Sequence, residues 1–325
     1  MMPAFSYQRA TSIRDALAGL SIGRSRILAG GTDLLGCLRD NVFTADTVVS
    51  ISGIRDLQKI NETPGGGLSI GALTTITGIS ESPVVRERYP ALAQAAAEVA
   101  SPQLRNQGTI GGNLCQKPRC WYYRGEFHCL RKGGDRCYAV SGENHYHCIF
   151  GGSRCYIVHP SDTAPALIAY GAAADIAGPA GMRRVPLEDF FVPPSKDVTK
   201  ETVLDAGEIV TGIVLPPRPA GLKSSYRKIR ARRSWDFALA GVALALEMGN
   251  GMVTDARIVL SGAAPVPWRL TDAEKTLIGK ALDPDSAKHV AALSVKDAEP
   301  LRHNAYKIPL FRGMIEEELT NISRE

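Results

Sequence analysis

The sequence lacks the long apolar segments and the strong charge excess that mark several classes of protein. Its longest apolar run, Phe237 to Leu246, has ten residues and is too short to cross a bilayer. The first twenty residues include Arg9, Arg14 and Asp15 and no uninterrupted apolar stretch, so no signal peptide is visible. A net charge of +5 over 325 residues is too small to indicate a nucleic-acid binder unless it is concentrated. We therefore expect a soluble, cytoplasmic chain without membrane insertion.

Several familiar motifs are absent as well. Neither the dinucleotide pattern G-x-G-x-x-G nor a P-loop occurs. The paired C-x2-C knuckles of structural zinc and the closely spaced cysteines of a ferredoxin are also missing. Hydrophobic residues at 44% and charged residues at 22% match an average soluble globular protein, and the length exceeds one ordinary domain. A folded, loop-rich protein mixing helices and strands is expected.

Short strand and helix patterns run along the whole chain. The first sixty residues are predicted to form a small β-α-β unit, with helices near 13–17 and 34–39 and strands at 26–29 and 47–51. The Asn250-Gly251 pair predicts a hairpin, because a tight turn needs the positive φ angles these residues tolerate. Further strands are expected at 68–72, 155–158, 208–215, 238–248 and 253–260, and helices at 89–100, 163–170, 271–278, 283–293 and 307–322.

Cysteine is concentrated in one segment. Cys37 stands apart, whereas the other six lie within 41 residues: Cys115, Cys120, Cys129, Cys137, Cys148 and Cys155. In a chain without a signal peptide, clustered cysteines favour a metal site over a disulfide framework. Their wide spacing leaves an iron-sulfur cluster, a zinc site and free thiols open.

Two glycine-rich loops precede this cysteine segment in the sequence. The first is Ala29-Gly30-Gly31-Thr32-Asp33, and the second is Thr109-Ile110-Gly111-Gly112-Asn113. Bare backbone amides at such turns can bind a diphosphate, although glycine pairs are commonly just turns.

The two loops and the residues around them resemble those of a known protein family. The strings 27–35 (ILAGGTDLL) and 105–114 (RNQGTIGGNL) resemble the FAD-binding subunit of the xanthine dehydrogenase, or molybdenum hydroxylase, family. Tyr226 to Ile229, Asp236 to Ala238 and Ala264 to Arg269 look like its C-terminal domain.

The resemblance implies an α+β fold with two domains. Residues 1–220 would form an FAD-binding domain of the vanillyl-alcohol-oxidase type, with subdomains at about 1–60 and 61–220 and a cysteine-rich loop at 115–155. Residues 221–325 would form a smaller C-terminal domain with an antiparallel sheet and helices. The family carries its FAD on both loops and on an aspartate after the insert. The implied cofactor-binding residues are therefore Leu28, Ala29, Gly30, Gly31, Thr32, Asp33, Leu34, Leu35, Thr109, Ile110, Gly111, Gly112, Asn113 and Asp162, with Ile213 and Lys228 weaker candidates near the flavin edge.

Three of these expectations are specific enough to test. A valine at Gly111 is predicted to block FAD by intruding on the diphosphate. Lys228 is either a cation beside the flavin or a lysine on a solvated strand. His159, in the string His-Pro-Ser-Asp, is expected in a turn before a helix rather than as a base or metal ligand.

The insert is similar to that of the aldehyde oxidoreductase branch, which carries an additional [4Fe-4S] cluster. That match implies Cys120, Cys129, Cys137 and Cys155 as ligands. Cys148 is a rival ligand, and Cys37 and Cys115 are expected to be buried small apolar residues.

The implied function is electron transfer within a heterotrimer. A large partner would hold molybdopterin and oxidise an aldehyde, a small partner would hold [2Fe-2S] clusters, and this chain would pass electrons through FAD to an unidentified acceptor. No catalytic acid or base is expected here, because the cofactor carries the redox chemistry. The alternatives are a xanthine or N-heterocycle dehydrogenase subunit and, in another class, a zinc-binding scaffold or nucleic-acid module. A partner with a signal sequence would place the complex in the periplasm.

Overall fold

A parallel sheet forms the first unit of the computed structural model, which describes residues 2–324. Its strands lie in the order β1-β3-β2, from Ser6–Arg9, Thr47–Ser50 and Ser25–Leu28. The helices α1 (Ile13–Leu20) and α2 (Leu34–Arg39) connect them, and the Ser12 hydroxyl caps α1 by accepting the Asp15 amide at 3.1 Å. The predicted helices and two strands are present. Strand β1 was missed because its side chains are mostly exposed and carry no apolar alternation.

The second unit is a five-stranded antiparallel sheet in the order β4-β5-β8-β6-β7. Its strands are Ile60–Glu62, Leu68–Gly71, Ile209–Leu215, Ala173–Gly178 and Gly181–Pro186, and η1 (Arg55–Gln58) precedes them. Short helices accompany this sheet: α3 (Ile76–Glu81), α4 (Pro83–Arg88), α5 (Pro90–Ala97), α6 (Pro102–Gln107), α7 (Ile110–Leu114), α9 (Thr163–Ala169) and α10 (Leu187–Phe190). Buried side chains of the sheet and of α3, α5, α7 and α9 form one core.

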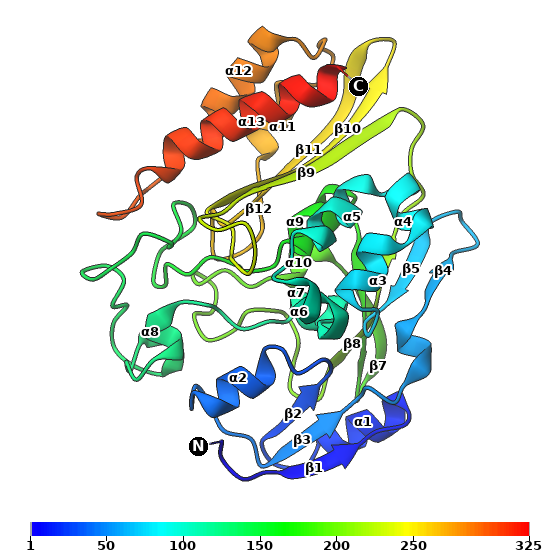
Figure 1. Cartoon of the computed structure of the whole chain (residues 1–325), viewed down its shortest axis with the longest axis vertical. Helices are drawn as coiled ribbons and strands as arrows, with labels where there is room; N and C mark the ends of the chain where they lie inside the picture. The colour runs from blue at the N-terminus through cyan, green and yellow to red at the C-terminus, as the bar shows by residue number, and fades with distance from the viewer. Residues whose placement is uncertain (1, 325) are drawn as a thin grey trace.

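The third unit is the antiparallel sheet β12-β11-β10-β9 with three helices (Figure 1). Its strands are Trp268–Arg269, Met252–Ser261, Ala240–Gly249 and Leu222–Ile229; its helices are α11 (Thr271–Lys275), α12 (Pro284–Leu293) and α13 (Lys307–Arg324). The predicted hairpin at Asn250 is present. The α+β class and the antiparallel C-terminal sheet are thus confirmed.

Strand β10 explains how this sheet joins the rest of the molecule. Successive side chains of a strand point to opposite faces. Ala243 and Ala245 lie in the core of the second unit, whereas Val242, Leu244 and Leu246 pack with the C-terminal helices. Both faces are covered, so the sheet is fixed against the second unit.

The cysteine-rich insert, 115–155, contains little regular structure. It holds α8 (Trp121–Arg124) and the short turn η2 (Leu130–Lys132), and it extends beside the other units in Figure 1. The strand predicted at Cys155 to Val158 is wrong: this segment is irregular. Its apolar side chains pack in the insert instead of pairing with a sheet. Within residues 2–324, no helix combines the length and apolar character needed to cross a membrane.

Candidate functional site

The two glycine loops meet at a common cleft. Gly30 lies so close to the chain before the second loop that a Cβ there would fall 1.8 Å from the carbonyl oxygen of Gln107. Gly31 adopts a φ of +74°, which favours glycine. Two adjoining cavities of about 230 and 680 Å³ share walls made by both loops. Ligand pockets are typically about 300–1,000 Å³, so this interloop cleft has room for a dinucleotide.

Most of the predicted cofactor-binding residues line the interloop cleft. They are Ala29, Gly30, Gly31, Thr32, Asp33, Leu34, Leu35, Thr109, Gly111, Gly112, Asn113 and Asp162. Four others are absent from its walls: Leu28, Ile110, Ile213 and Lys228. Ile110 and Ile213 are fully buried in the core of the second unit, and Leu28 packs beside Leu38 and Val48.

Some lining residues were not anticipated. Ile209 and Val210, at the start of β8, line the cleft where Ile213 on the same strand does not. Trp235 and Phe237 line its other end. The sequence of an apolar strand does not show which of its residues reach a cleft, so Ile209 and Val210 could not be predicted. For the end at Phe237, the string Asp236 to Ala238 was the one sequence feature that pointed to a role.

Gly111 and Gly112 have different surroundings. A Cβ on Gly111 would come within 2.9 Å of the Ala72 Cβ, inside the protein. A Cβ on Gly112 would meet only the Thr109 hydroxyl within 4 Å, and Gly112 lines both cavities. The expectation for Gly111→Val therefore needs correction, since that side chain would disturb β5 and α7 before it reached a ligand. Gly112 is the position that faces the cleft.

Asp33 connects the first loop to the cysteine-rich insert. Its carboxylate accepts the Lys117 backbone N–H at 2.7 Å and an Arg124 N–H at 2.7 Å, and Arg119 lies 3.0 Å away. A free carboxylate beside a diphosphate would be repelled, but here three donors from the insert surround it. Asp33 therefore links the loop to the insert.

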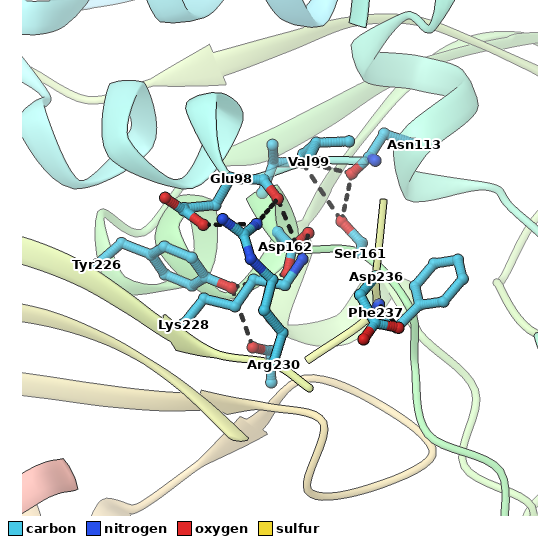
Figure 2. Close-up of polar contacts among 12 residues, drawn as sticks. Glu98, Val99, Asn113, Ser161, Asp162, Tyr226, Lys228, Arg230, Asp236 and Phe237 are labelled. Atoms are coloured by element: carbon cyan, nitrogen blue, oxygen red, sulfur yellow. Dashed lines mark hydrogen bonds and ion pairs between the residues drawn. The ribbon is translucent and has the colours of Figure 1, made fainter. Parts of the chain in front are cut away.

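A buried ion pair stands at the opposite wall (Figure 2). Asp162 accepts hydrogen bonds from the Tyr226 hydroxyl at 2.9 Å and from Lys228 Nζ at 2.8 Å, and Lys228 also donates to the Glu98 carbonyl. Burial raises the pKa of Asp162, against the opposing effect of Lys228, and it raises the pKa of Tyr226 well above its usual value. The Lys228 side chain is 0% exposed, so the solvated-strand interpretation is wrong. Its charge is paired with Asp162.

Polar side chains also join the second loop to the segment after the insert. The Asn113 amide oxygen accepts hydrogen bonds from the Ser161 hydroxyl at 2.5 Å and the Thr163 hydroxyl at 2.7 Å, and Figure 2 shows the contact to Ser161. Ser161 also caps α9 by accepting the Ala164 amide. The Asp162 side chain makes no capping hydrogen bond to α9 and instead accepts a hydrogen bond from Lys228.

His159 lies in the irregular segment that precedes α9. Its Nδ1 accepts the Ser161 N–H at 3.4 Å, which leaves the ring in a fixed orientation against Phe191. Burial lowers the pKa of His159 to about 3, so the ring is neutral at physiological pH.

We predict that Lys228→Met destabilises the protein by about 3–5 kcal/mol, because it leaves the buried Asp162 carboxylate without its charge partner. Urea unfolding of the purified protein measures the change. Lys288→Met, at an exposed site on α12, is the matched control and should change the unfolding free energy little. Equal stability of the two variants would contradict the prediction.

The four predicted cysteine ligands line a single small cavity. Cys120, Cys129, Cys137 and Cys155 surround it, with Arg131, His147 and apolar or aromatic side chains completing its wall. This narrow space has a volume of about 10 Å³, and we call it the cysteine cavity. Burial raises the pKa of Cys120 to about 12. Among residues 2–324, no three His, Cys, Asp or Glu side chains converge on one point as ligands of a single ion do.

The remaining cysteines lie outside this cavity. Cys148 is 1% exposed and does not line it, and its backbone amide donates to the Tyr156 carbonyl. Cys37 is fully buried, as expected. Cys115 is only partly buried and lines the interloop cleft.

The C-terminal domain holds the far side of the insert. The Asn304 side-chain amide donates to the carbonyls of His147 and Cys148, each at 3.0 Å. Lys307 is fully buried at the start of α13 and donates to the carbonyls of Gly262 and Tyr146. The insert is therefore fixed at one end to the first glycine loop and at the other to the helix α13 region.

Asn304→Ala should loosen this attachment, since two buried carbonyls lose their donor at about 1–3 kcal/mol each. We expect limited trypsin digestion to cut the insert faster in this variant than in the wild type. Asn321→Ala, at an exposed site on α13, provides the control. An unchanged cleavage rate in Asn304→Ala would show that other contacts hold the insert.

Comparison with known proteins agrees with this geometry. Residues 3–218 match the family model of the FAD binding domain in molybdopterin dehydrogenase, and residues 224–321 match that of the CO dehydrogenase flavoprotein C-terminal domain. The chain is 36% identical over 315 residues to the aldehyde oxidoreductase FAD-binding subunit PaoB of Escherichia coli, covering 95% of each chain. It is 29% identical to the carbon monoxide dehydrogenase medium chain of Hydrogenophaga pseudoflava, with 98% of this chain and 96% of that one covered.

Solved structures show the same likeness. A carbon monoxide dehydrogenase structure from Hydrogenophaga pseudoflava matches with a TM-score of 0.77 and 28% identity, covering 98% of this chain and 96% of that chain. Quinoline 2-oxidoreductase from Pseudomonas putida 86 matches with a TM-score of 0.77 and 25% identity, covering 100% and 98%. The chain therefore belongs to the FAD-binding subunits of the molybdenum hydroxylase family, and is an oxidoreductase subunit.

Proposed function

We propose that this chain is the FAD- and [4Fe-4S]-binding electron-transfer subunit of a heterotrimeric aldehyde oxidoreductase. The observation that carries the proposal is the cysteine cavity: four thiols from widely separated positions in the sequence line one space. The 36% identity to a subunit named for aldehyde oxidation supports the substrate class.

The residues of the interloop cleft suit FAD. Gly30, Gly31 and Gly112 lie on both sides of the cleft, and their lack of side chains leaves the backbone exposed to a ligand there. The loops would hold the diphosphate, while Asp162 and Phe237 lie at the end where the ring would sit. The bound flavin supplies the redox chemistry, and the protein positions it and excludes water.

The cysteine cavity suits an iron-sulfur cluster. Thiolates are the usual ligands of such clusters, and four cysteines line this one cavity. Arg131 lines this cavity, and its Nε is buried without a hydrogen-bond partner in the described chain. Buried polar groups normally find partners, so this N–H fits a cavity that takes up a polar, anionic group.

We infer a large subunit that holds molybdopterin and a small subunit that holds [2Fe-2S] clusters, because this chain is similar over nearly its whole length to the medium chain of carbon monoxide dehydrogenase. Electrons from the large subunit would reach FAD here and leave to an external acceptor. The cell compartment would be that of the partners, periplasmic if one of them carries a signal sequence.

Purification of the chain with its co-purifying subunits tests the proposal. We expect flavin absorbance, iron in excess of the small subunit's clusters, and reduction of an artificial acceptor with aromatic or aliphatic aldehydes. Turnover of xanthine or an N-heterocycle, without aldehyde turnover, would favour the alternative substrate class. A colourless preparation containing zinc would instead support the scaffold alternative.

A further inference from the structure

Arg131 is the charged side chain placed deepest at the cysteine cavity. It lies on η2, two residues after Cys129, and its side chain is only 2% exposed. It lines the same cavity as the four cysteines and lies next to the thiol of Cys155. Arginine is rarely buried to this degree unless its charge is paired, and Glu201 is the partner here.

The polar partners of Arg131 satisfy only part of its guanidinium. Nη1 donates to Glu201 Oε1 at 2.8 Å and to the Lys200 carbonyl at 3.2 Å. Nε has no hydrogen-bond partner within residues 2–324. Leaving a buried donor without an acceptor destabilises a protein, and an acceptor inside the cavity would satisfy this N–H.

The charges around Arg131 do not cancel. Glu201 is 8% exposed and pairs with both Arg131 and Lys117, so two cations share one carboxylate. The segment 115–155 contains seven Lys or Arg residues and three Asp or Glu residues, and therefore supplies +4 of the chain's net +5. Among the residues that line the cysteine cavity, Arg131 carries the one formal charge, and Glu201 offsets it only in part.

We propose that Arg131 sets the reduction potential of the [4Fe-4S] cluster, through its buried positive charge and its free N–H. This inference rests on the proposed function. A cluster becomes more negative when it gains an electron, and hydrogen bonds and charges near its sulfurs shift its potential. A fixed cation favours the reduced form, and Arg131 accordingly raises the potential. It is a positioning and tuning residue, because cysteines alone bind the iron.

The test is a redox titration of the intact complex, followed by the electron paramagnetic resonance of the reduced cluster. In Arg131→Met the stem still fills its space, but the charge and the N–H are gone. We expect the ratio of reduced to oxidised cluster at a fixed potential to fall about tenfold, which is 59 mV for a one-electron couple. Arg154→Met is the control, since Arg154 adjoins Cys155 but is exposed to solvent. Its potential should equal that of the wild type.

A second variant keeps the inference testable if Arg131→Met loses the cluster. Glu201→Gln removes the carboxylate that offsets Arg131 and should shift the potential upward. If Arg131→Met retains its cluster iron, an unchanged potential in that variant overturns the inference. If Arg131→Met loses the cluster and cannot be titrated, an unchanged potential in Glu201→Gln overturns it. Wild-type complex without this cluster would instead contradict the proposed function itself. The two failures are thus distinguishable.

Discussion

Gly112→Val is expected to yield a folded protein that purifies without FAD. Gly112 lines both cavities of the interloop cleft, and a Cβ there would meet only the Thr109 hydroxyl, at 3.1 Å. A branched side chain would therefore project into the space assigned to the cofactor rather than into the protein. We expect at least a tenfold loss of bound flavin, measured by absorbance at equal protein concentration.

The matched control is Gly65→Val. Gly65 lies in an exposed turn, and a Cβ at this position would have no other atom within 4 Å, so the same substitution should leave flavin content unchanged. Circular dichroism and the unfolding midpoint show whether Gly112→Val remains folded. Full flavin occupancy in a folded Gly112→Val protein would place the cofactor elsewhere.

Cys129→Ser should remove the [4Fe-4S] cluster and leave FAD in place. A serine oxygen is a poor replacement for a thiolate ligand of iron, and losing one of four ligands opens the cluster to dissociation. Iron and sulfide assays on the complex should fall by the content of one cluster. The flavin spectrum should persist, because Cys129 lines the cysteine cavity and not the interloop cleft.

Two further cysteine variants decide the ligand set. Cys148→Ser should retain the cluster, since Cys148 is buried outside the cavity, and Cys37→Ala should retain it for the same reason. If Cys148→Ser lost the iron while Cys137→Ser kept it, the two residues would exchange roles. Unchanged iron in Cys129→Ser would refute the cluster assignment.

The insert also connects two parts of the molecule. It reaches the first glycine loop through Asp33 and the helix α13 region through Asn304 and Lys307. A cluster bound between these attachments would brace both, whether or not electrons pass through it.

Local patterns sufficed for much of the fold. The Asn-Gly turn, the alternation along the C-terminal strands and the capping serine at residue 12 act over a few residues, so the sequence shows them directly. The segment at 155–158 was misjudged for the same reason. A short apolar run does not reveal whether a neighbouring strand is present to pair with it.

The sequence by itself determined the order and spacing of the two glycine loops, of the cysteine-rich insert that follows them and of the C-terminal hairpin. These features together identified the family. Only the tertiary structure decided which side chains meet. It paired Lys228 with Asp162, turned Asp33 toward the insert, put Ile209 and Val210 rather than Ile213 at the cleft, and placed Arg131 among the cysteines. Each of these depends on contacts between residues distant in the chain, and such contacts leave no local pattern to read.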